Sequence, residues 1–333
     1  MTKVKKTPVL ILLLAFLTGP VYGANPILFR ISVENSISHV QTQYVQRFAQ
    51  ALESEMPGVF DVRFYHSAQL YGDREVVAAM ARGNLEMAVP GTWQLDRYVP
   101  EISVFLLPQF FGGDGSANDR YLESSQGQLL IRTLENHLAV HIPGLWMDLG
   151  PAHVFTSSQK IESYEDFRRL RIRVAGGEAN RLRIETFGGT GVIVAWTDLP
   201  EWLENHSIDG VLTSFETIRS ASLWENGLRY VYTDYQYFPQ YVPLVAEGVF
   251  RRLTAEQQNQ FRQIWNRIAG EERIAAAQAQ WEAREEVESY GIVITVPNPQ
   301  QQAQAKEHLM GHQEDMVSTL GIDHGYLPTT DVE

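Results

Sequence analysis

Cysteine is missing altogether from this chain of 333 residues. Its absence excludes disulfides, zinc-thiolate sites, iron-sulfur clusters and a cysteine nucleophile. A chain of this length buries enough apolar surface to be stable without such cross-links. We therefore expect a fold that is stabilised by burial, and chemistry that involves no thiol.

Long apolar runs are scarce as well. The only sustained run extends from Val9 to Leu17, after a lysine-rich start and before a stretch of small residues. It is shorter than the ~20 residues that cross a bilayer, and this arrangement is typical of a secretory signal peptide. We predict that residues 1–23 are a signal peptide and that the mature chain is an exported, periplasmic protein that does not itself insert into the membrane.

Basic residues are outnumbered by acidic ones. The chain has 27 Lys and Arg against 40 Asp and Glu, which gives a formal net charge of -13. Nucleic acids and anionic membrane surfaces are bound by clustered Lys and Arg, so the balance excludes nucleic acid as a partner. Any anionic ligand must be held by positive charge placed locally, against the overall field.

The common enzyme signatures are absent too. The sequence contains no G-x-S-x-G, phosphate-loop, dinucleotide or H-E-x-x-H pattern. Most of its carboxylates are expected to lie on solvent-exposed faces. We expect no enzyme, no catalytic residues and no cofactor. The competing hypothesis, a periplasmic hydrolase with paired carboxylates, requires two acids that converge in one cleft, and no motif supplies them.

A metal site is not expected either. The nine histidines are scattered along the chain and form no H-E-x-x-H pattern. Residues 112–119 superficially resemble a calcium loop, but position twelve counted from Asp114 is Ser125 and not an acidic ligand. An ordinary glycine-rich connection is the alternative interpretation of this segment.

Strands and helices alternate along most of the chain. Apolar spacing predicts a first unit with strands 27–33, 59–65 and 85–89 and helices 38–56 and 73–82. A second unit follows, with strands 153–156, 170–174, 191–194 and 208–212 and helices 179–187 and 198–205. The alternation predicts an α/β fold of two lobes, each a doubly wound and mainly parallel sheet.

One long helix is expected near the end of the chain. A capping box formed by Thr254 and Gln257 marks its start and Gly291 its end, so it covers about residues 253–290. At 1.5 Å per residue such a helix is ~55 Å long, more than one lobe, and should span both. A last helix is expected near residues 300–320. The resulting boundaries are 24–148 plus about 238–262 for lobe I, 149–237 plus about 263–300 for lobe II, and 301–333 for a C-terminal helix and tail.

Two arginines alternate with apolar residues in the strand 170–174. Arg171 and Arg173 face one way, and their apolar neighbours face the other. Both could be solvated, or one guanidinium could lie in an interlobe cleft and bind a carboxylate through two N–H groups. Aromatic residues near other strand ends could line such a cleft or belong to the core: Trp93, Phe155, Trp196, Phe215 and Tyr237.

Several short motifs occur in a characteristic order. They are residues 68–75 with 80–87, 163–167 with 170–174, 208–211, and 223–225 with 229–231. This order resembles the periplasmic solute-binding subunits of tripartite ATP-independent periplasmic (TRAP) transporters, of the dicarboxylate-binding, DctP-like type. The resemblance implies two lobes that close on a small organic acid and deliver it to integral-membrane permease subunits, with a long helix that crosses both lobes.

The resemblance also implies a ligand site. The arginine that pairs with the ligand carboxylate falls on Arg173, and the aromatic that packs over the ligand falls on Trp196. Further contacts fall on Asn35, His39, Thr92, Trp93, Phe155, Thr213, Phe215 and Glu216.

Two departures from the family pattern bear on the ligand. Many relatives have a second arginine where this chain has Ala152 or His153, and an asparagine where it has Thr213. A second carboxylate would have a weaker partner, which favours a monocarboxylate with polar substituents, such as a sugar acid, over a simple dicarboxylate. A receptor of the same fold that serves a sensor kinase is a further alternative.

Overall fold

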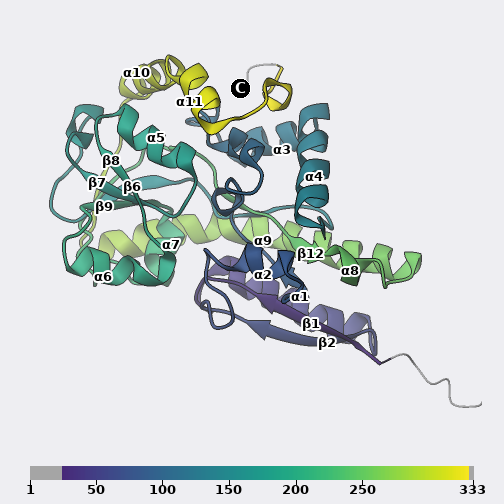
Figure 1. The fold of residues 1–333 in the computed structure, drawn as a ribbon. Coiled ribbons are helices and arrows are strands. Elements are labelled where there is room, and N and C mark those ends of the chain that lie inside the picture. The colour runs from purple at the N-terminus through teal and green to yellow at the C-terminus, as the bar shows by residue number, and fades with distance from the viewer. Residues whose placement is uncertain (1–24, 330–333) are drawn as a thin grey trace, which may run out of the picture.

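Two β-sheets and one long helix organise the chain (Figure 1). The computed structural model describes residues 25–329, so the predicted signal peptide lies outside the described residues. Among these residues, no helix combines the length and the apolar character needed to cross a bilayer.

The first sheet has five strands in the order β2-β1-β3-β12-β4. β1 runs parallel to β2 and β3, with Ile27 opposite Phe60, whereas β12 is antiparallel to both of its neighbours. Its strands are β1 (Ile27–Ser32), β2 (Phe60–Tyr65), β3 (Met87–Ala88), β4 (Val140–His141) and β12 (Leu244–Ala246). The helices of this part of the chain are α1 (Val40–Glu55), α2 (Val76–Ala81), η1 (Thr92–Gln94), η2 (Pro100–Leu106), η3 (Pro108–Phe110), α3 (Gly115–Glu123), α4 (Ser125–Leu138) and α8 (Glu247–Phe250).

The second sheet has six strands in the order β13-β10-β6-β9-β7-β8. β7 runs parallel to β8 and β9, and β6 is antiparallel to β9 and β10. Its strands are β6 (His153–Thr156), β7 (Arg171–Val174), β8 (Thr190–Ile193), β9 (Gly210–Thr213), β10 (Tyr230–Tyr232) and β13 (Val293–Thr295). The associated helices are η4 (Tyr164–Phe167), α5 (Glu178–Thr186), η5 (Trp196–Asp198), α6 (Leu199–Glu204) and α7 (Phe215–Ser220).

The chain passes between the sheets in two adjacent segments. A small antiparallel pair, β5 (Met147–Asp148) and β11 (Gln240–Tyr241), lies at one end of these segments. Beyond it, the amide of Ala152 donates to the carbonyl of Tyr237 at 3.0 Å. The crossings therefore run side by side and form a double connection between the two lobes.

The long helix α9 (Ala255–Ser289) contributes to both cores. Phe261 and Trp265 pack with Phe48 of α1, while Val287 belongs to the cluster around Phe155 in the second lobe. The predicted capping box is present at its start. The helix therefore crosses from one lobe to the other, as Figure 1 shows.

The two-lobed α/β fold with its long helix is confirmed, and both sheets also contain antiparallel pairs. The expected last helix is two helices, α10 (Pro299–Met310) and α11 (Gln313–Leu320), followed by η6 (His324–Tyr326). The interruption falls at Gly311 and His312, and glycine costs a helix interior ~1 kcal/mol relative to alanine. The predicted lobe boundaries remain a prediction.

Candidate functional site

Arg173 is a buried cation in the middle of β7, and only 2% of its surface is exposed. Its Nε donates to the carbonyl of Val194 at 3.1 Å, but its Nη2 has no hydrogen-bond partner among the described residues. Burial lowers the pKa of Arg173, and the nearby carboxylates of Asp73 and Glu34 oppose that shift. A buried donor without a partner is costly, so this position calls for an acceptor from outside the chain.

Arg171, on the same face of β7, has a different environment. Its Nε and Nη2 donate to the two carboxylate oxygens of Asp209 at 3.0 and 2.8 Å. Its side chain is 43% exposed. The strand therefore contains one arginine of each kind. Arg171 is solvated and paired, and Arg173 is buried.

Trp196 and Asp73 join the two lobes next to Arg173. The guanidinium carbon of Arg173 lies 5.8 Å from the centroid of the Trp196 ring, within the range of a cation–π contact. The Trp196 amide donates to Oδ2 of Asp73 at 3.0 Å, and the Arg74 amide donates to Oδ1 at 3.1 Å. Burial raises the pKa of Asp73, and these two amides oppose the rise.

Glu34 is the second carboxylate of this region, and it follows β1 in the first lobe. The side-chain amide of Gln94 donates to its carboxylate. Burial raises the pKa of Glu34 to about 8, with a further contribution from the negative charge of Asp73. Sequence reasoning missed Glu34 as a site residue, and it missed Asp73 although that residue lies within the motif 68–75. We call Arg173, Trp196, Asp73, Glu34 and Gln94 the clamp.

Two small cavities flank the contact between Asp73 and Trp196. One, of about 230 Å³, lies between the lobes and is lined by Glu34, Ser36, Trp196 and Leu223 among others. The other has the same volume and is lined by residues that include Asp73, Gln94 and Gly176. Arg173 lines neither cavity, so the lobes are closed over it.

The lobes approach each other most closely at Gly176, just after β7. A Cβ at this position would lie 2.7 Å from the carbonyl oxygen of Trp93 in the first lobe. Trp93 is buried, and its indole N–H has no partner among residues 25–329. Glycine therefore allows the closed arrangement at a point where any larger residue would push the lobes apart.

Three of the predicted site residues lie around Tyr241. Asn35 donates to its hydroxyl at 2.8 Å, and the rings of Trp93 and His39 lie 5.5 and 6.2 Å from the Tyr241 ring. Tyr241 belongs to β11, in the connection between the lobes. No local sequence pattern indicates a role for Tyr241, because its partners lie about 150 to 200 residues away along the chain.

His39 and Glu216, both predicted to contact a ligand, face each other across the lobes. His39 Nε2 lies 3.3 Å from Glu216 Oε2, and the Val40 amide donates to Glu216 Oε1 at 3.1 Å. Burial lowers the pKa of His39, and Glu216 opposes that shift. The hydroxyls of Ser36 and Ser38 donate to the carbonyl of Ser220 at 3.3 and 3.0 Å. We call these residues, Ser36, Ser38, His39, Val40, Glu216 and Ser220, the latch.

The remaining predicted site residues lie in different surroundings. Thr92 is buried with a hydroxyl that has no partner in the described chain, and Thr213 lies opposite His153 in the pairing of β9 with β6. Phe155 is fully buried in the second lobe, where its ring centroid is 5.3 Å from that of Phe215. It lines neither clamp cavity, because the inward alternation of β6 places it in the core.

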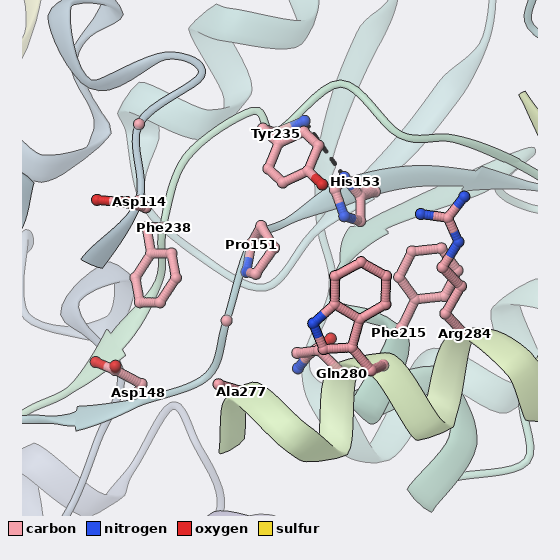
Figure 2. A pocket seen from close by; sticks show the side chains of 13 residues that line it. Asp114, Asp148, Pro151, His153, Phe215, Tyr235, Phe238, Ala277, Gln280 and Arg284 are labelled. Atoms are coloured by element: carbon pink, nitrogen blue, oxygen red, sulfur yellow. Dashed lines mark hydrogen bonds between the residues drawn. The ribbon is translucent and has the colours of Figure 1, made fainter. Parts of the chain in front are cut away.

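Phe215 also lines a larger cavity at the connection between the lobes. This cavity of about 440 Å³ lies against α9, and Figure 2 shows His153, Tyr235 and Arg284 among its lining residues. The Tyr235 amide donates to Nδ1 of His153 at 3.3 Å. Burial lowers the pKa of His153 to about 3, with a contribution from Arg284. His153, one of the two residues that the family resemblance places where many relatives have a second arginine, is therefore neutral at physiological pH.

The glycine-rich segment 112–119 opens a helix. The Asp114 side chain accepts from the Ser116 amide at 2.9 Å and caps α3. Within residues 25–329, no three His, Asp or Glu side chains are grouped in a way that could hold a metal ion.

Comparison with known proteins gives a consistent result. The model of the family described as bacterial extracellular solute-binding protein, family 7 (DctP), matches residues 31–318. The C4-dicarboxylate-binding periplasmic protein DctP of Shewanella loihica is 22% identical over 262 residues, which cover 78% of this chain and 76% of that protein.

Solved structures show the same fold. The sugar-acid-binding protein DctPAm of Advenella mimigardefordensis, in complex with galactonate, has a TM-score of 0.83 at 18% identity, covering 89% of this chain and 94% of the other. A TRAP periplasmic solute-binding protein of Shewanella oneidensis, with bound succinate, has a TM-score of 0.80 at 16% identity, covering 89% and 96%.

Proposed function

The chain belongs to family 7 of the bacterial extracellular solute-binding proteins, and from this premise we propose that it is a periplasmic receptor for a small organic acid. It closes its lobes over a monocarboxylate, with Arg173 on the carboxylate and Trp196 against the guanidinium, and delivers the ligand to the permease subunits of a TRAP transporter. The predicted signal peptide would export it, and in this proposal it catalyses no reaction.

The observation that carries the proposal is the unpaired Nη2 of Arg173. A fully buried guanidinium offers a planar fork that matches a carboxylate in charge and in geometry. The related structures that hold galactonate and succinate support an organic acid as the ligand class. The neutral His153 supports a single carboxylate, because it supplies no second cation.

A thermal-melt screen of the mature protein, refolded to remove carried-over ligand, tests the ligand class. The panel contains aldonates, uronates, C4-dicarboxylates, 2-oxo acids and amino acids. A ligand at 100 times its dissociation constant stabilises the folded state by ~2.7 kcal/mol, a rise of a few degrees in Tm. We expect rises only with organic acids; no rise with any of them would contradict the proposal.

The matched variants are R173A and R171A. Removing Arg173 should cost at least ~2 kcal/mol of binding, a loss of at least ~30-fold in affinity. Removing Arg171, which pairs with Asp209 at the surface, should leave affinity unchanged. Equal affinity of R173A and the wild-type protein would show that the site is elsewhere. A gene for membrane permease subunits beside this one, and none for a sensor kinase, is expected for the transport role.

A further inference from the structure

Glu34 is the clamp carboxylate that lines the cavity between the lobes. It is partly buried, and it lines the clamp cavity together with Trp196. It interacts electrostatically with Arg173 across the cleft. A carboxylate in this place affects any molecule that occupies the cavity.

The two clamp carboxylates differ in their remaining capacity to accept hydrogen bonds. Each oxygen of Asp73 accepts a backbone N–H, one from Trp196 and one from Arg74. Within residues 25–329, Glu34 accepts only from the side-chain amide of Gln94, whose own Oε1 has no partner there. Asp73 is therefore committed to the protein's backbone, and Glu34 keeps capacity to accept from a ligand.

The charges of the clamp also discriminate between ligands. Arg173 faces two carboxylates, Glu34 and Asp73, and Arg74 interacts with Asp73 as well. His153, one of the two residues that the resemblance places at the family's second arginine position, is neutral. When Glu34 is ionised, a second ligand carboxylate would add a like charge beside it in a partly dry cavity, which is unfavourable. A hydroxyl or an ammonium group would instead donate to Glu34 and complete its hydrogen bonding.

We propose that Glu34 determines the ligand class: it accepts a hydrogen bond from a hydroxyl or ammonium group of a monocarboxylate held by Arg173, and in its ionised form it disfavours dicarboxylates. This inference rests on the proposed function and narrows it. According to this inference, a residue of the first lobe selects against a second ligand carboxylate, in addition to the missing arginine of the second lobe.

The protonation of Glu34 separates the two kinds of donor. The groups that face Glu34 are Gln94, Asp73, Arg173 and Tyr241, and burial with the charge of Asp73 raises its pKa. Most of the unligated protein therefore carries a proton on Glu34 at neutral pH, and the negative charge of Glu34 is present above about pH 8. An ammonium ligand binds the ionised form and displaces that proton, whereas a hydroxy acid does not require its release.

The test uses acids that share a carbon skeleton and differ in the group at the far end. The six-carbon pair is D-gluconate and D-glucarate, and the four-carbon set is 4-hydroxybutyrate, 4-aminobutyrate and succinate. Titration calorimetry of the wild-type protein at pH 9, where Glu34 is ionised, should show each monocarboxylate binding about tenfold or more tighter than the dicarboxylate of the same skeleton. Repeating the titration at pH 7 in buffers of different ionisation enthalpy shows whether protons are released, which distinguishes an ammonium from a hydroxyl donor.

The variant is Glu34→Gln, with Glu53→Gln on the exposed face of α1 as the matched control. E34Q should narrow the ratio between monocarboxylate and dicarboxylate affinities about tenfold, and E53Q should leave the ratio unchanged. If E34Q does not fold, as judged by circular dichroism, the wild-type ratios decide alone.

Two results would overturn the inference alone: a wild-type protein that binds the dicarboxylates as tightly as their monocarboxylate partners, or a folded E34Q with the wild-type ratio. Failure of every acid in both this set and the broader screen would overturn the proposed function and this inference with it. Binding that depends on Arg173 but not on Glu34 would leave the proposed function intact.

Discussion

The clamp and the latch both join the two lobes, but they differ in how far the protein itself pairs their polar groups. In the latch, Glu216 Oε1 accepts from the Val40 amide, and Ser36 and Ser38 share the carbonyl of Ser220. His39 Nε2 and Glu216 Oε2 lie 3.3 Å apart without a hydrogen bond. In the clamp, the Nη2 of Arg173 has no partner in the described chain. The latch therefore favours closure for any occupant, and the clamp favours it only when an acceptor is bound.

This difference gives a physical account of how a ligand shifts the lobes towards closure. Closing without a ligand gains the latch contacts but buries an unpaired guanidinium. A carboxylate removes that cost, so the closed state binds it more tightly than the open state does and becomes more populated. Selectivity then belongs to the clamp and the general tendency to close belongs to the latch.

The largest expected effect comes from replacing the charge of the clamp. Arg173→Met should lower affinity for organic acids at least ~30-fold without lowering the Tm of the unligated protein, because it removes a buried charge that lacks a full partner. Calorimetric titration and a thermal melt give the two values. An unligated Tm that falls together with the affinity would mean that the protein itself satisfies Arg173, and the comparison would fail.

Blocking closure should weaken binding of every ligand alike. Gly176→Ala places a Cβ against the carbonyl of Trp93, and such overpacking costs typically 1–3 kcal/mol, or about 5- to 150-fold in affinity. The control is Gly270→Ala inside α9, where an added Cβ meets nothing within 4 Å. Small-angle scattering at saturating ligand should show G176A more extended than the wild type; an unchanged radius and affinity would contradict the close approach.

Weakening the latch should have a smaller and unselective effect. Glu216→Gln keeps an acceptor for the Val40 amide but loses the charge that faces His39 and Arg219, so affinity should fall about 3- to 10-fold for all ligands. Glu282→Gln, the exposed partner of Arg219, is the matched control. A change in ligand preference in E216Q would instead support the direct ligand contact that the family resemblance implies.

The smallest effect on affinity is expected outside both contacts, at His153, whose titration acts on the free energy of unfolding. Its pKa of about 3 lies below the ~6.5 of an unfolded chain, so below pH 6.5 the unfolded state binds a proton that the folded state does not. This group therefore lowers the free energy of unfolding as pH falls, by at most ~1.4 kcal/mol per unit. Urea unfolding between pH 7 and 4 should show a shallower loss in His153→Asn than in the wild type. Identical slopes would mean that His153 titrates normally in the folded protein.

Elements that depend on neighbouring residues could be predicted from the sequence. The capping box of Thr254 and Gln257 begins α9, and the alternation of residues 27–33 predicts β1. Arg173 could be singled out because its strand carries a recognisable motif and has an arginine at every second position. In these cases the period of the pattern and the local caps determine the structure.

What the sequence could not show is which distant residues meet. Glu34 and Gln94 are 60 residues apart, and Asn35 and Tyr241 are 206 apart, so no local pattern connects them. The same limitation applies to the approach of His39 to Glu216 across the lobes, and their predicted contact with the ligand stays a prediction. Phe155 has the aromatic character of a cleft residue, and only the packing of the second lobe places it in the core.

The shared helix α9 has a consequence for how the molecule melts. Phe261 and Trp265 are fixed in one core and Ala283 and Val287 in the other, with no break in the helix between them. Neither lobe can lose its packing without fraying a helix that the other lobe needs. The two lobes should therefore unfold in one cooperative transition, with equal calorimetric and van't Hoff enthalpies, although each lobe has a sheet of its own.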